Sequence, residues 1–192
     1  FLFSKGFDLF FSFKEKQTIE SVVEKYISKV KASLKNDFEK NNLSLDDFEM
    51  GILAFKKEQL LEIYVRKNET ENWKLLKKYN FTAFSGEIGP KLNNGDNQIP
   101  EGIYQMEYLN PNSRFHLSIK VSYPNSFDLE KAKLDKRTDL GGDIMIHGKS
   151  ATIGCIPVGD KNIEEIFILA TKAKNKKFPI IIAPHDFRTN KT

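Results

Sequence analysis

Several residue types that carry protein chemistry are scarce in this 192-residue sequence, which holds one cysteine, three histidines and one tryptophan. A single cysteine cannot form an intramolecular disulfide, so disulfide bonds do not hold this fold together. No two histidines stand at ligand spacing, and this argues against a zinc site. The glycines form no phosphate-binding loop ahead of a helix, so Gly89, Gly95 and Gly102 are assigned to turns. We therefore expect neither a metal nor another cofactor.

A strong excess of charge is also missing. The formal net charge is +4, and the basic residues are spread along the chain, which does not favour nucleic acid as a partner. A mild positive charge does suit an anionic polymer. Hydrophobic residues make up 40% of the chain and charged residues 29%, which is typical of a folded globular protein.

The sequence contains no long apolar run. Its opening, FLFSKGFDLFFSF, is aromatic, but Lys5 and Asp8 interrupt it, and it is shorter than the roughly 20 apolar residues of a membrane-spanning helix. The first residue is Phe1 rather than methionine. Two interpretations of this segment stay open, an arm packed on the domain and the remainder of an export signal or membrane anchor.

The spacing of apolar residues predicts two helices and a set of strands. Residues 17–41 repeat apolar side chains every three or four positions, as in an amphipathic helix. Residues 162–174 form a second expected helix, which Asp160 would cap. Short β-like runs occupy most of the remainder: MGILAF, LLEIYV, WKLLKKYNF, GIYQMEY, FHLSIKVSY, DIMIH and FPIIIA. The sequence thus predicts a β-rich α+β fold, with an N-terminal arm and helix over residues 1–48 and a second domain over residues 49–192.

The stretch HGKSATIGCIP, residues 147–157, holds the single thiol. A lone cysteine is most often a small buried apolar residue. Three local features favour a reactive Cys155 instead: Gly154 precedes it, His147 ends a strand-like run, and the segment between them is small and polar. A glycine lets backbone N–H groups approach a reacting carbonyl, and a thiolate–imidazolium pair would be a nucleophile at neutral pH. The residues alone leave both interpretations open.

Two motifs carry a resemblance to a known family. IHG is followed by S-x-x-x-G-C, and a loop of the form GD-x-x-x-PEG-x-Y lies upstream. Together they resemble the L,D-transpeptidase (YkuD-type) catalytic domain, in particular its YafK-like subgroup, over most of the chain. The resemblance implies that residues 49–192 are the catalytic domain, with Cys155 as nucleophile and His147 as base. It further implies that the Gly148 carbonyl orients the imidazole and that the N–H groups near Gly154 and Cys155 form an oxyanion hole.

The same resemblance implies peptidoglycan stem peptides as substrates, a wall-linked lipoprotein as one conceivable acceptor, and a location in the periplasm or cell envelope. It leaves three functions open: transfer of an acyl group to an amine, which we favour, hydrolysis by the same site, and a catalytically silent wall-binding module. The loop SGEIGPKLNNGDNQIPEG would act as a mobile flap beside the cleft, because long loops in compact domains are usually functional.

This chain departs from the wider family at the position two residues after the cysteine, where Pro157 replaces the usual arginine. Another residue must then hold the substrate carboxylate, and the candidates are Arg114, Lys149 and Lys120, unless each is only a solvated surface charge. Further expected substrate contacts are His116, Tyr123 and Asn125, in or next to the run FHLSIKVSY. A structural role is the alternative for His116.

Overall fold

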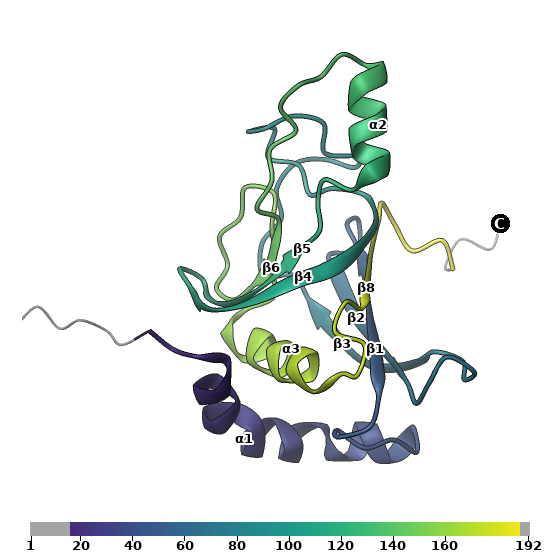
Figure 1. Cartoon of the computed structure of the whole chain (residues 1–192), viewed down its shortest axis with the longest axis vertical. Coiled ribbons are helices and arrows are strands. Elements are labelled where there is room, and N and C mark those ends of the chain that lie inside the picture. Colours follow the sequence, from purple (N-terminus) through teal and green to yellow (C-terminus); the bar gives the residue numbers. More distant parts are fainter. Residues whose placement is uncertain (1–15, 189–192) are drawn as a thin grey trace, which may run out of the picture.

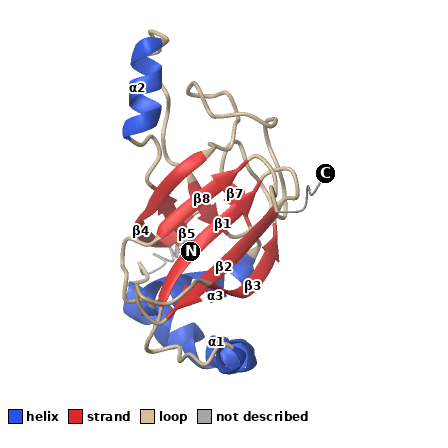
Figure 2. Ribbon diagram, turned by 90° about the vertical axis from the view of Figure 1, so that its right-hand side faces the viewer, coloured by secondary structure: helices blue, strands red, loops and turns tan. Residues whose placement is uncertain are grey.

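A computed structural model describes residues 16–188 of the chain, so the aromatic arm at the N-terminus lies outside the described residues. Within this range eight strands form one mixed sheet, and helices lie below it and at one end (Figures 1 and 2). The elements in chain order are α1 Ile19–Lys40, β1 Glu49–Phe55, β2 Leu60–Arg66, β3 Lys74–Asn80, β4 Gly102–Ser113, β5 His116–Val121, α2 Ser126–Leu134, β6 Met145–His147, β7 Ile156–Pro157, α3 Asp160–Lys172 and β8 Pro179–Ala183.

The helix α1 forms as its apolar spacing predicts. Thr18 caps its N-terminus and makes a reciprocal capping box with Ser21, which satisfies backbone donors that the first turn leaves free. The apolar side chains recur every fourth residue and make one buried stripe: Val22, Tyr26, Val30, Leu34 and Phe38. This stripe packs on α3, and α1 lies beneath α3 in Figure 1.

The sheet has the strand order β3-β2-β1-β8-β4-β5-β6-β7. Its neighbours are antiparallel except at two places, where β8 runs parallel to β1 and β7 runs parallel to β6. The last strand in sequence therefore lies in the middle of the sheet, between strands that are distant in the chain. The short strands β5, β6 and β7 form one end of the sheet, and they carry the segment around the single thiol.

The helix α3 is apolar on nearly every side because it lies between the sheet and α1. It contacts β5 and β6 on one side and α1 on the other. Burying such a helix holds the β5–β7 end of the sheet rigidly against the core. Its buried apolar residues are Ile163, Ile166, Phe167, Ile168, Leu169 and Ala170.

The predicted α+β class and its main elements are confirmed, with two differences. Asp160 does not cap α3: Gly159 is the N-cap and makes no side-chain cap, while Asp160 Oδ1 accepts a hydrogen bond from Lys149 N. The helix α2, which Asn125 caps, was not predicted, because it buries only Ala132 and so lacks an apolar stripe. In the described part of the chain, no helix has both the length and the apolar character needed to cross a bilayer.

Candidate active site

The register of three strands brings His147 and Cys155 to one cleft. His147 is the last residue of β6, and Cys155 directly precedes β7. Because β6 and β7 pair in parallel, with Ile146 opposite Ile156, the two residues lie on neighbouring strands. Both line a cavity of about 440 Å³, which we call the thiol cleft. Its lining also includes Lys91, Asn94, Gly95, Asn97, Phe115, Gly142, Asp143, Ile144, Ala151, Thr152, Ile153 and Gly154.

The imidazole of His147 is held in a single tautomer. Its Nδ1 lies 2.5 Å from the carbonyl oxygen of Gly148. A carbonyl can only accept, so Nδ1 carries the proton and Nε2 presents a lone pair. Among the described residues, Nε2 is buried without a hydrogen-bond partner. The Phe115 ring packs on the imidazole with the ring centroids 4.5 Å apart, which fixes its plane.

Burial favours the neutral form of both groups. Desolvation lowers the pKa of His147, although the Gly148 carbonyl acts in the opposite sense. Desolvation also raises the pKa of Cys155, and the nearby Lys120 ammonium partly offsets the shift. The Cys155 thiol is directed at the Asp143 carbonyl oxygen, 3.5 Å away. Burial disfavours both charged partners, so it favours a neutral thiol and a neutral imidazole over the expected thiolate–imidazolium pair, which stays a prediction.

The turn before the thiol is organised by Thr152, which the sequence reasoning missed. Its Oγ1 accepts hydrogen bonds from the N–H groups of Gly154 (3.2 Å) and Cys155 (2.9 Å) and donates to the Cys155 carbonyl (2.7 Å). The two N–H groups expected to form an oxyanion hole thus converge on one point, which the threonine hydroxyl occupies. Gly154 has a φ of 127°, and a Cβ there would lie 3.0 Å from Gln98 O, so this turn requires glycine.

One wall of the thiol cleft is the loop that was expected to act as a flap. The carboxylate of Asp96 ties it internally, because it accepts hydrogen bonds from Lys91 Nζ and from the N–H groups of Leu92, Asn93 and Gln98. The buried Lys56 ammonium donates to the carbonyls of Gly89 (2.6 Å) and Ile99 (2.9 Å). These contacts brace the loop in this structure, and its expected mobility stays a prediction.

Lys56 also lies 3.0 Å from the Glu101 carboxylate, so the base of this wall contains an ion pair. Its side chain is fully buried, and removing either partner would leave a charge without compensation. The sequence offered no signal for this role, since a lysine next to a turn usually faces solvent.

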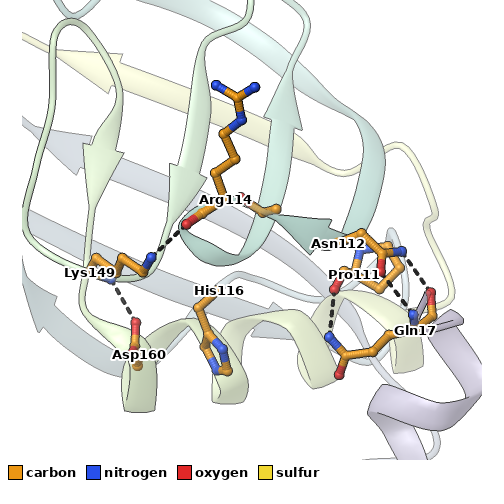
Figure 3. Close-up of a pocket in the computed structure, with 8 residues that line it drawn as sticks. Gln17, Pro111, Asn112, Arg114, His116, Lys149 and Asp160 are labelled. Atoms are coloured by element: carbon orange, nitrogen blue, oxygen red, sulfur yellow. Dashed lines mark hydrogen bonds between the residues drawn. The ribbon is translucent and has the colours of Figure 1, made fainter. Parts of the chain in front are cut away.

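Two of the expected substrate contacts, His116 and Arg114, lie in a second depression, which we call the polar hollow (Figure 3). Its cavity is about 330 Å³, and Gln17 and Asp160 contribute to its lining. His116 Nε2 is 3.0 Å from Glu164 Oε1, on α3. The Arg114 guanidinium points away from Asp160 in Figure 3.

The other two expected contacts serve the fold around α2 and the loop. The buried Tyr123 hydroxyl donates to the carbonyls of Lys91 (3.3 Å) and Leu140 (3.2 Å). Asn125 caps α2, and its amide donates to Ile103 O at 2.9 Å. None of His116, Arg114, Tyr123 and Asn125 is among the residues that line the thiol cleft. Their contact with substrate stays a prediction.

No group of three or more His, Cys, Asp or Glu side chains within residues 16–188 is arranged to hold a metal ion. The polar side chains that line the thiol cleft are instead those of His147, Cys155, Lys91, Asp143, Asn94, Asn97 and Thr152. This set can transfer a proton and attack a carbonyl without a further group.

Comparison with known proteins gives a family for this arrangement. The profile of the YkuD family, described as the L,D-transpeptidase catalytic domain, matches residues 50–182. The Escherichia coli K12 protein YafK, named as a candidate L,D-transpeptidase, is 36% identical over 124 residues, which cover 64% of this chain and 47% of YafK.

Two solved structures are similar in fold. The helical cell shape determining protein Pgp2 of Campylobacter jejuni has a TM-score of 0.57 and 23% identity, over 73% of this chain and 49% of Pgp2. Bd1075 of Bdellovibrio bacteriovorus has a TM-score of 0.50 and 24% identity, over 72% of this chain and 48% of its own. The chain therefore spans about half the length of the relatives it matches.

Proposed function

Because this chain belongs to the YkuD family of L,D-transpeptidase catalytic domains, we propose that it is a peptidoglycan-remodelling cysteine acyltransferase of the cell envelope. Cys155 is the nucleophile, His147 the general base, and stem peptides of the wall are the acyl donors. The single observation that supports this most is the paired geometry at the thiol cleft. A buried imidazole with a free Nε2 lone pair lines the same cavity as the single thiol of the chain.

Acylation begins when a stem peptide enters the cleft and the thiol turns from the Asp143 carbonyl towards His147. The thiol proton moves to Nε2, and the sulfur forms a bond to the carbonyl carbon of the third residue of the stem. The C–N bond to the terminal D-alanine then breaks, and the imidazolium gives its proton to the leaving amine. The Gly148 carbonyl stabilises the imidazolium in between, because its hydrogen bond to Nδ1 favours the charged ring.

The oxyanion formed in this step needs donors. The N–H groups of Gly154 and Cys155 are available once the Thr152 hydroxyl rotates away, and both already point to one place. Removing one such donor in other acyl-transfer enzymes costs about 10²–10³ in turnover, so their alignment is central to the proposal.

Deacylation uses the same groups in reverse. An amine from a second stem peptide, or from a wall-linked lipoprotein, loses a proton to His147 and attacks the thioester; its nitrogen bonds to the carbonyl carbon and the C–S bond breaks. Water in place of the amine would release a trimmed stem. We favour the amine because the wider resemblance is to transferases, and the net charge of +4 helps the protein collect anionic wall polymer.

Incubation with purified muropeptides, followed by mass spectrometry, tests this function. The wild-type protein should release D-alanine and give crosslinked stems, through an adduct on Cys155. Cys155→Ala should give none of these products while its thermal unfolding stays close to wild type. Cys155→Ser should be almost inactive, because His147 would have to deprotonate a far weaker acid.

Each other outcome has a defined meaning. Trimmed stems alone, with abundant acceptor amine present, would make the protein a hydrolase of the same family. Untouched muropeptides from the folded wild-type protein would leave only a wall-binding module. Products from Cys155→Ala would remove Cys155 from the mechanism. The domain limits at residues 48 and 49 stay a prediction.

A further inference from the structure

The strand pairing places one more charged side chain on the face that carries the thiol. In the β5–β6 register Lys120 is opposite Met145, and Ser118 is opposite His147. In the β6–β7 pair Ile146 is opposite Ile156 and His147 is opposite Pro157, so one step back in this register puts Cys155, the residue before β7, beside Met145. Side chains directly opposite one another share a face of the sheet, and so do residues two apart on a strand. Lys120, Met145 and Cys155 thus form one row across three strands.

The row is short enough for Lys120 to act on a molecule held at the thiol. Neighbouring strands are about 4.8 Å apart, so two spacings put the backbones of Lys120 and Cys155 roughly 10 Å apart. Both side chains contact Asp143: the thiol its carbonyl oxygen at 3.5 Å, and the Lys120 ammonium its carboxylate at 3.8 Å. Lys120 is also the foremost charged neighbour that lowers the pKa of Cys155.

The ammonium of Lys120 makes few polar contacts with the described residues. Its side chain is only 8% exposed, and its one ion pair within residues 16–188 is the 3.8 Å contact with Asp143, whose own side chain is 91% exposed. No hydrogen bond of the ammonium is found in the described part of the chain. On the same face, Ser118 Oγ and His147 Nε2 are buried and lack partners among the described residues. Buried polar groups are normally satisfied, so the unpartnered Ser118 Oγ and His147 Nε2, together with an ammonium that has one 3.8 Å ion pair, indicate that this face meets a polar ligand.

Lys91 does not compete for this role. Its ammonium lines the cleft but is already satisfied by Asp96 (2.6 Å) and by the Asn93 carbonyl (2.8 Å). The Lys149 ammonium donates to the Arg114 carbonyl in the polar hollow, at 2.7 Å. Lys120 is not itself among the residues that line the thiol cleft, but its ammonium contacts Asp143, which is. Of the three candidates considered from the sequence, it is therefore the one that shares the sheet face of the thiol and whose charged group makes no hydrogen bond with the described residues.

We propose that Lys120 binds the free carboxylate of the residue expelled from the acyl donor, and so restricts the enzyme to stems that end in a carboxylate. This inference rests on the proposed function. In such a donor only the amide nitrogen and one Cα separate the carboxylate from the attacked carbonyl, so a carbonyl at Cys155 brings the carboxylate towards the Lys120 end of the row. The Asp143 carboxylate is the competitor that it displaces.

The test compares two synthetic stem tetrapeptides, one with a C-terminal carboxylate and one with a C-terminal carboxamide, and measures kcat/KM for release of the terminal residue. Wild type should prefer the carboxylate. Lys120→Gln should lose roughly 10- to 100-fold on the carboxylate substrate, the range of a charge-assisted hydrogen bond, and change little on the carboxamide. Lys120→Arg should keep part of the preference.

Asp143→Asn is the matched second variant, since asparagine tolerates the positive φ of this position (54°) and keeps the backbone carbonyl that faces the thiol. It removes the competing carboxylate, so KM for the carboxylate substrate should fall. An equal loss on both substrates in folded Lys120→Gln, with KM unchanged in Asp143→Asn, would overturn the assignment of Lys120 and leave the proposed function standing. Wild type inactive on both substrates would instead defeat the proposed function, and this inference with it.

Discussion

The β4–β5 turn contributes Phe115 to the thiol cleft and Arg114 to the polar hollow, and the two depressions differ in how far their polar groups are satisfied. In the hollow, Gln17 exchanges hydrogen bonds with Asn112, and Asp160 accepts from Lys149 N. His116 is paired with Glu164. In the cleft, by contrast, His147 Nε2 is buried without a partner among the described residues.

This difference distinguishes polar groups that stabilise the fold from polar groups that are free to react. Hydrogen bonds between protein groups stabilise the fold, and a group so engaged must break a bond before it can meet a ligand. A buried group left without a partner destabilises the folded state, so it is retained only where something else uses it. The comparison therefore assigns chemistry to the cleft and a stabilising role to the hollow, although both depressions have similar volumes and each contains a histidine.

The two histidines give the largest expected effect. His147→Gln should lower kcat/KM by roughly 10²–10⁴-fold, the usual range for a positioned general base. His116→Gln should stay within a few-fold of wild type, because its ring is engaged with Glu164 in the hollow. Steady-state kinetics with a stem peptide measure both. The reverse order of severity would move the base to the hollow.

The pH dependence of thiol alkylation tests the neutral state of the cleft. Desolvation raises the pKa of Cys155, so at any pH the free protein holds less thiolate than an exposed cysteine. The rate with iodoacetamide should therefore rise about tenfold per pH unit, or about 100-fold from pH 6 to pH 8. A plateau already reached below pH 7 would mean that a thiolate–imidazolium pair exists, against the neutral pair described above; His147→Gln is the control that should abolish such a plateau.

The smallest effects concern stability, and they compare one hydrogen-bonding group from each region. Thr152→Val keeps the side-chain shape but leaves two N–H groups and one carbonyl of the turn without their partner, and should lower the free energy of unfolding by about 1–3 kcal/mol. Thr152→Ser should be close to wild type. Gln17→Ala, at the rim of the hollow, should change the free energy of unfolding by no more than about 0.5 kcal/mol. Urea unfolding measures all three, and equal losses from Thr152→Val and Gln17→Ala would contradict the ranking.

The parts of the fold that follow a regular period were predictable. Apolar residues at every fourth position from Val22 to Phe38 indicate α1. Alternating apolar and polar residues, or short apolar runs, indicate most of the strands. The helix α2 was missed because tertiary contacts and the Asn125 cap, rather than an apolar stripe, define it. Asp160 was misassigned as a cap, since a sequence cannot show that Lys149 N competes for the same carboxylate.

In the candidate site, too, some features were predictable from the sequence and others depend on packing. The stretch HGKSATIGCIP contains a thiol, an imidazole and two glycines within a few positions of one another, and cysteine and histidine are rare in this chain. Whether the imidazole keeps a free lone pair depends on its backbone contact and its burial, and both come from packing.

By itself, the sequence identified the family and the candidate reactive groups, because side-chain chemistry and short motifs are local properties. Only the tertiary structure decided which groups meet. The sheet register puts Lys120 in one row with Cys155 although 35 positions separate them (155 − 120), and it leaves His116 in a different depression. Such pairings arise from hydrogen bonds between strands that are distant in the chain, and no local spacing encodes them.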